Sequence, residues 1–193
     1  MAKLAVEALS RVEGRTLAWV RPAAIVFGAS LFVALCARVT VPLPFTPVPL
    51  TLANFGVLVV GLLLGSSRGF AALALYLVEG VIGLPVFNPA GPGGFAQLLG
   101  PTGGYLMAYP LVAGLAGWLM ERGHKTFARA ALAGLLAEGV LFTVGLGWLT
   151  IWAGSLKRAF FYGLYGFVFA EVIKVLLAAA IAVRVKRSPK VLG

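Results

Sequence analysis

The sequence predicts an all-α membrane protein with six transmembrane helices, in which long first and third extracellular loops cap a cavity. Hydrophobic residues make up 61% of the 193-residue chain and charged residues only 11%, against about 25% in soluble domains. Mean hydropathy is +0.99. The apolar residues form six runs of helix length, and two uncharged segments rich in proline and glycine separate some of these runs.

The positive charge of the chain lies around the apolar runs. A formal net charge of +10 would favour nucleic acid as the partner of a soluble protein. Here the basic residues stand between apolar segments, where they set the orientation of the chain and contact anionic lipid. We therefore expect the lipid bilayer as a partner and no nucleic acid.

The chain divides into a membrane domain and two basic ends. Residues 1–21 form either a helix on the membrane surface or a frayed cytoplasmic tail, since apolar and basic residues alternate there at helical spacing. Residues 22–185 form the six-helix membrane domain, and residues 186–193 form a basic cytoplasmic tail. A loop is expected around 150–162. The six spans are expected at 22–40, 50–64, 69–84, 103–120, 128–149 and 163–183.

The first span carries a strip of small side chains. Ala24 and Gly28 are four residues apart and therefore share one face of a helix. Small residues on one face let a second helix approach closely. The strip either docks a partner subunit or packs inside the protein.

Two segments that interrupt the apolar runs are interpreted as lids. Residues 41–49 contain four prolines, which impose an extended, non-helical path. Residues 84–105 contain four prolines and six glycines, so we expect no helix anywhere in them. This second segment carries no charge but holds Phe87 and Phe95. Such a loop is expected to pack over a cavity rather than to be solvated.

The distribution of basic residues predicts the orientation. With six spans, both terminal segments, the turn at Arg68 and the turn at 121–129 fall on one face, and they carry most of the lysines and arginines. The opposite face has only Arg38, Lys157 and Arg158. The positive-inside rule then places both termini in the cytoplasm and both lids outside.

Four ionisable side chains lie within predicted spans and away from their ends. Each would cost roughly 2.5–3.5 kcal/mol on a lipid-facing helix, so all four should face inward. Glu171 and Lys174, three residues apart on the last span, either neutralise each other or meet a polar ligand. The second alternative is favoured because a buried ion pair stabilises a fold poorly. Glu79, which precedes the glycine-rich loop, is a further candidate for ligand binding, and Glu138 is open to a structural role between helices.

Signals of catalysis are missing from the sequence. The segment 100–104 (GPTGG) is not followed by lysine, and the chain has no Walker A pattern. No catalytic triad, redox pair or metal-ligand spacing is present either. We expect no catalytic residues, no metal site and no enzymatic activity.

Four blocks of sequence, in this order, resemble the BioY family, the biotin-binding S components of energy-coupling factor (ECF) transporters. They are residues 44–51 (PFTPVPLT), 61–65 (GLLLG), 83–87 (GLPVF) and 99–106 (LGPTGGYL), followed late in the chain by an acid three residues before a lysine. The resemblance spans about residues 20–185. It implies an S-component-like fold of six helices, a cavity near the outer face that the first and third loops cap, and tight capture of biotin.

The resemblance also implies partners and a location. These are a transmembrane coupling subunit and two ABC-type ATPase subunits, in the cytoplasmic (inner) membrane of a prokaryote. ATP hydrolysis would take place on the ATPase subunits. No cofactor is expected, and biotin is the expected ligand.

By position, the acid and the lysine of the family fall on Glu171 and Lys174. Two departures stand out. Relatives often carry Asp where this chain has Glu171, and Gln where it has Ala53. If that Gln lines the pocket in relatives, Asn54 or a water molecule has to replace it here.

The chemistry of biotin agrees with this assignment. Its ureido group has two N–H donors and one acceptor, which an ionised glutamate and a lysine can serve, although the end of biotin that Lys174 meets stays open. The remaining candidates are directional polar groups, backbone N–H groups of the glycine loop, and aromatic rings that would cover the bicycle. They are Asn88, Gln97, Thr102, Gly93, Gly94, Phe45, Phe87 and Tyr105.

Two alternatives remain. The S-component fold serves several vitamins and selectivity depends on a few loop side chains, so the ligand can be another vitamin. The chain can also be a self-sufficient oligomeric secondary carrier, although it lacks clear repeated halves.

Overall fold

The computed structural model describes residues 2–187 and, for side chains, residues 19–187. It is almost entirely helical, with one short antiparallel strand pair. The elements are α1 (Ala2–Arg38), β1 (Thr40–Val41), β2 (Leu50–Thr51), α2 (Ala53–Leu64), α3 (Ser66–Val81), α4 (Gly94–Leu99), α5 (Gly103–Glu121), α6 (Phe127–Ala153), α7 (Leu156–Phe160), the π-helix η1 (Phe161–Tyr165) and α8 (Val168–Arg187).

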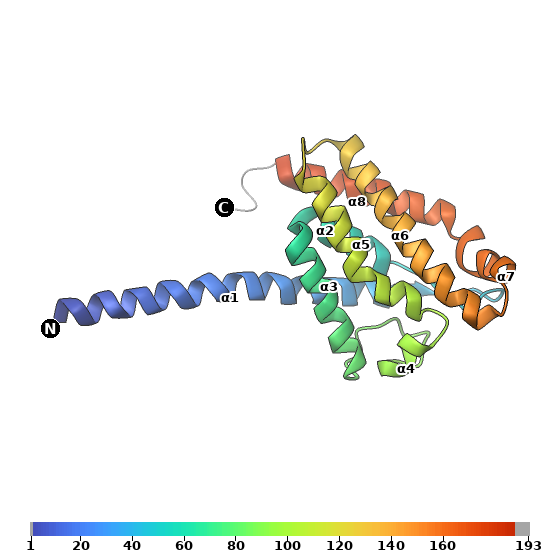
Figure 1. Ribbon diagram of the computed structural model, residues 1–193, viewed down its shortest axis with the longest axis horizontal. Helices are drawn as coiled ribbons and strands as arrows, with labels where there is room; N and C mark the ends of the chain where they lie inside the picture. The colour runs from blue at the N-terminus through green and yellow to red at the C-terminus, as the bar shows by residue number, and fades with distance from the viewer. Residues whose placement is uncertain (1, 188–193) are drawn as a thin grey trace.

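Six long helices form a bundle, and α5 lies at its centre, packed against α2, α3 and α6 (Figure 1). On one side α8 packs on α2 and α6, and on the other α1 packs on α2 and α3. The N-terminal half of α1 extends away from the other helices (Figure 1). Residues 2–21, for which a surface helix and a frayed tail were both open, therefore continue the first helix.

The prediction of an all-α membrane protein is confirmed, and each of the six predicted spans contains a long helix. In the described part of the chain, three helices are long and apolar enough to cross a bilayer, and α7–η1 with α8, bent by 46°, gives a fourth. With 12 and 16 residues, α2 and α3 are only about 18 and 24 Å long. The count of six full spans therefore stays a prediction.

Two of the sequence predictions are wrong in detail. Residues 94–99 form the short helix α4 inside the segment for which no helix was expected, because the prolines flank these six residues and none lies within them. Residues 156–165, expected as a loop and the start of the sixth span, form α7 and η1, and the straight part of the last helix begins only at Val168.

Close helix packing depends on Gly61 in α2. A Cβ atom at this position would lie 2.5 Å from the carbonyl oxygen of Ala113 in α5. Only a residue without a side chain lets α2 and α5 approach this closely. The contact holds the last turn of α2 against α5 and so fixes how α2, which carries Asn54 in its first turn, packs on that helix.

The loops at one end of the bundle are fixed to the helices. In the first loop, β1 and β2 pair through Thr40–Thr51 and Val41–Leu50, so residues 42–49 project as a hairpin. The extended, non-helical character predicted for this segment is confirmed. The hydroxyl of Thr46 donates a hydrogen bond of 2.6 Å to the carbonyl of Tyr162 in η1, which holds the hairpin against that π-helix.

Candidate functional site

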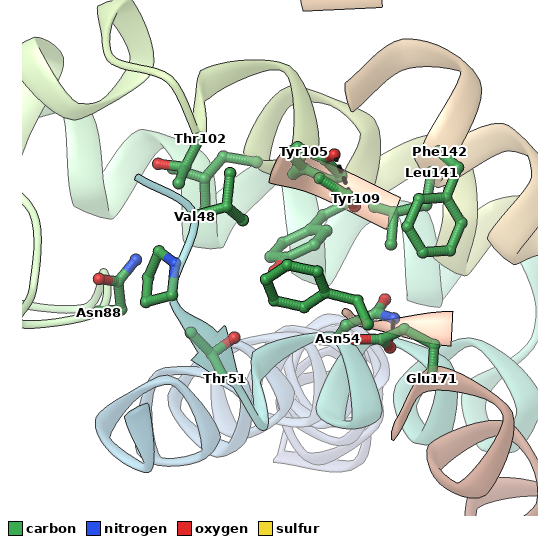
Figure 2. A pocket seen from close by; sticks show the side chains of 14 residues that line it. Val48, Thr51, Asn54, Asn88, Thr102, Tyr105, Tyr109, Leu141, Phe142 and Glu171 are labelled. Carbon is green, nitrogen blue, oxygen red and sulfur yellow. Dashed lines mark hydrogen bonds between the residues drawn. The ribbon is translucent and has the colours of Figure 1, made fainter. Parts of the chain in front are cut away.

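A small cavity of about 60 Å³ opens among the first loop, α2, α5, α6, η1 and α8. Figure 2 shows side chains from segments far apart in the sequence converging on this space. The lining residues are Val48, Pro49, Thr51, Asn54, Asn88, Thr102, Tyr105, Leu106, Tyr109, Leu141, Phe142, Gly163, Phe167 and Glu171.

Asn54 joins two acidic side chains at one end of the cavity. Its amide Nδ2 donates to Glu138 Oε1 at 2.5 Å and to Glu171 Oε2 at 2.7 Å. All three side chains are buried. Asn54 reaches both because it lies in the first turn of α2, between α6, which carries Glu138, and α8, which carries Glu171.

Lys174 completes this arrangement, which we call the inner cluster (Asn54, Glu138, Glu171 and Lys174). Its Nζ donates to Glu171 Oε1 at 2.7 Å and to the backbone carbonyl of Thr51 at 2.6 Å. Lys174 is buried, and it is not one of the residues that line the cavity. The structure thus places Glu171 and Asn54 at the cavity surface and Lys174 behind them.

Two acceptor atoms of the inner cluster receive no hydrogen bond from the described residues. In the described part of the chain, Asn54 Oδ1 and Glu138 Oε2 are buried and have no hydrogen-bond partner. A buried acceptor without a donor costs free energy, and a ligand that supplies donors would recover it. With two acidic side chains and one basic one, this end of the cavity suits a group with N–H donors and disfavours an anion.

Aromatic rings form the wall of the cavity beyond the inner cluster. Tyr105 and Phe142 meet edge to face, with ring centroids 6.4 Å apart, and the Tyr105 hydroxyl donates to the carbonyl of Gly163 at 3.1 Å. Tyr109 and Phe167 add two buried rings. A flat, largely apolar ligand body would find matching surface here.

The third loop, residues 82–102 between α3 and α5, closes the other end of the cavity. Asn88 lies across the cavity from Asn54 and Glu171 (Figure 2). The indole N–H groups of Trp148 and Trp152 donate to the carbonyls of Gly100 and Leu99, each at 2.8 Å. These two tryptophans therefore anchor the loop to α6.

A second hollow lies on the outer side of Asn88. We call this space of about 400 Å³ the outer hollow. Among the residues that line it are Arg38, Pro85, Phe87, Asn88, Gly93 and Gly94. Asn88 lines both spaces. The guanidinium of Arg38 donates to the carbonyl of Pro85, which ties the end of α1 to the third loop.

Eight of the twelve predicted ligand residues line the cavity or the outer hollow. Five of them line the cavity: Asn54, Asn88, Thr102, Tyr105 and Glu171. Gly93, Gly94 and Phe87 line the outer hollow instead, and Lys174 supports Glu171 from behind.

Three predicted residues lie away from both spaces. Glu79 accepts a hydrogen bond of 2.5 Å from the hydroxyl of Ser30, which links α3 to α1. Gln97 is buried within the third loop, where its Oε1 accepts from the backbone N–H of Gly93 at 3.1 Å. Phe45 is half exposed on the first loop.

The structure also adds lining residues that the sequence analysis did not name. Three of them lie one helical turn from a residue that it did name: Tyr109 after Tyr105, Phe142 after Glu138 and Phe167 before Glu171. Helical periodicity alone could have found these three. Gly163 and Thr51 had no such signal, since their positions depend on η1 and on the strand pair.

The small-residue strip of α1 lies on the surface. Ala24 and Gly28 are exposed, and a Cβ atom at Gly28 would meet no other atom within 4 Å in the described chain. The alternative that this strip packs inside the protein is therefore wrong.

Known proteins match the chain along most of its length. The family model described as "BioY family" matches residues 7–190. The probable biotin transporter BioY of Pyrococcus horikoshii is 38% identical over 159 residues, which cover 81% of this chain and 93% of the relative. The biotin transporter BioY of Thermotoga maritima is 36% identical over 160 residues, covering 82% and 94%.

A solved structure has the same fold. The crystal structure of the S-component for biotin from an ECF-type ABC transporter matches with a TM-score of 0.79 and 27% sequence identity. The match covers 88% of this chain and 92% of that one. The S-component-like fold expected from the sequence is thereby confirmed.

Proposed function

Because the chain belongs to the BioY family, we propose that it is the biotin-capture subunit of a vitamin uptake transporter driven by an energy-coupling module. Its relatives are named as transporters, and the chain is a multi-pass membrane transport protein rather than an enzyme. Biotin is the proposed ligand, and no cofactor is needed for its capture.

One observation in the structure supports this proposal above the others: an acceptor-rich inner cluster beside an aromatic wall within one cavity. The ureido group of biotin presents two N–H donors, which Glu171 and Asn54 can accept at the cavity surface. The bicycle would lie against Tyr105, Tyr109 and Phe142. The valeryl chain would then point toward Asn88.

The test is equilibrium binding of labelled biotin to the purified chain in detergent. We expect saturable binding that excess unlabelled thiamine and riboflavin do not displace. Displacement by either competitor would indicate an S component for another vitamin. Absence of biotin binding by folded protein would contradict the proposal and leave a carrier with a different ligand.

The Glu171→Gln substitution is expected to weaken biotin binding by about 1–3 kcal/mol, because a neutral amide is a weaker acceptor for the ureido N–H groups than a carboxylate. Isothermal titration of wild type and variant measures this difference. As a control, Glu79→Gln changes the same functional group at a buried site away from the cavity and should bind biotin as wild type does. Equal affinities of Glu171→Gln and wild type would place the ureido contact elsewhere.

We propose the same membrane and partners that the resemblance implies: the cytoplasmic membrane of a prokaryote, a transmembrane coupling subunit and two ABC-type ATPases. The positions of basic residues support an orientation with both termini in the cytoplasm. Arg21 and Arg68 border one hollow at the end of the bundle opposite the lids, and the turn at 122–126 lies at that end too. This basic end would face the cytoplasm.

The Gly28→Leu substitution is expected to leave biotin binding unchanged and to reduce biotin uptake severalfold if the strip of Ala24 and Gly28 docks the coupling subunit. A Cβ atom at this position would meet no other atom of the described chain within 4 Å, so the fold should tolerate the change. Uptake of labelled biotin by cells that also express the coupling module measures the effect. Gly139→Leu is the matched control, since Gly139 is equally open but lies on α6. Equal uptake by both variants would exclude the docking role.

A further inference from the structure

The two ends of the cavity differ in charge. At the inner end, Glu171 lines the cavity, and the amide of Asn54 donates to both Glu171 and Glu138. The basic group of the inner cluster, Lys174, already donates to Glu171 and to the backbone carbonyl of Thr51. An anionic group placed there would face two acidic side chains across a low-dielectric space. A ligand with a carboxylate is therefore expected to bind with that carboxylate at the opposite end.

A basic side chain lies near the opposite end of the cavity. Asn88 lies across the cavity from Glu171 and also lines the outer hollow (Figure 2). Among the described residues that line the cavity or the outer hollow, Arg38 is the one basic side chain. It stands at the end of α1, directly over the third loop.

The guanidinium of Arg38 has N–H donors available to bind an anion. Its one side-chain hydrogen bond in the described chain goes to the carbonyl of Pro85, and no described carboxylate lies within salt-bridge distance of it. A guanidinium has five N–H donors in a fixed plane, which suits two-point binding of a carboxylate. The bond to Pro85 orients this plane at the outer hollow, and the exposed side chain remains free to move toward a ligand.

From this arrangement we propose that Arg38 recognises the carboxylate of the ligand. The inference depends on the proposed function, in which the ligand is biotin. The bicycle occupies the cavity with its ureido group at Glu171 and Asn54. The valeryl chain passes Asn88, and its carboxylate meets Arg38 in the outer hollow. Arg38 thus makes the capture site selective for an acid over its neutral derivatives.

The test compares biotin with biotinamide, which has the same shape but lacks the negative charge. Wild type should prefer biotin. Arg38→Gln should weaken biotin binding about tenfold or more and leave biotinamide binding unchanged, because only the charged contact is lost. Arg38→Lys should fall between, since it keeps the charge but loses the planar fork.

Two controls make the result specific. Arg158→Gln removes an exposed arginine at the same end of the bundle that borders neither space, and it should keep the wild-type preference. Glu171→Gln should weaken both ligands equally, because both carry the ureido group. Biotinamide binding by Arg38→Gln also reports that this variant is folded.

The outcomes separate this inference from the proposed function. If wild type binds biotin and Arg38→Gln keeps the same ratio of biotin to biotinamide affinity, the carboxylate role of Arg38 is wrong while biotin capture stands. A parallel loss of both ligands in Arg38→Gln would assign Arg38 only to holding the third loop through Pro85, and would also overturn the inference. If wild type binds neither ligand, the proposed function fails, and this inference fails with it.

Discussion

A Lys174→Met variant is expected to lose tight biotin binding and about 3–5 kcal/mol of unfolding free energy, the range measured when one partner of a buried ion pair is removed. Lys174 is the one basic side chain of the inner cluster and donates to Glu171 Oε1 at 2.7 Å. Without it, Glu138 and Glu171 face each other across the single amide of Asn54. Thermal unfolding of the detergent-solubilised protein and biotin titration at pH 7 measure the two losses.

The double variant Lys174→Met/Glu138→Gln tests whether charge is the cause. Glutamine at position 138 keeps an oxygen to accept from Asn54 and cannot carry a negative charge, so part of the lost stability should return. Lys157→Met, on the exposed surface of α7, serves as the control and should unfold like wild type. A Lys174→Met protein as stable as wild type would mean that the inner cluster holds no charge that needs neutralising.

The Gly61→Val substitution is expected to cost about 3 kcal/mol of unfolding free energy or more, and to abolish biotin binding with it. The new Cβ atom would lie 2.5 Å from the carbonyl oxygen and 2.8 Å from the Cα atom of Ala113, and backbone atoms cannot rotate aside. The helices α2 and α5 would have to separate. Because Asn54 lies on α2 and Tyr105 on α5, this separation would open the cavity itself.

Gly147→Val is the matched control for this prediction. Gly147 lies within α6, and a Cβ atom there would meet no other atom within 4 Å in the described chain. The same exchange should therefore change the thermal midpoint little. Near-wild-type stability of Gly61→Val would show that α2 and α5 can move apart without loss, contrary to the close packing described above.

Much of the site was accessible from the sequence because intramembrane polar residues are rare and expensive. Glu171 and Lys174 stood out for that reason, and their spacing of three residues predicted the contact that the structure has at 2.7 Å. The lids were equally visible, since closely spaced prolines and glycines prevent long helices. The same reasoning failed for Glu79, because a polar residue inside a span can equally be satisfied by a neighbouring helix, here through Ser30.

The sequence by itself determined the membrane class, the BioY family, the position of the lids and the local pairing of Glu171 with Lys174. The membrane class depends on composition, the family on short blocks of sequence in a fixed order, and the lids and the ion pair on residues within a few positions of one another. Only the tertiary structure decided that Asn54 bridges Glu138 and Glu171, from which it is separated by 84 and 117 residues. It also placed Lys174 behind the cavity wall and Arg38 over the third loop. Such contacts follow from how helices pack around glycines like Gly61, and a pattern along one helix does not specify which face of another helix it will meet.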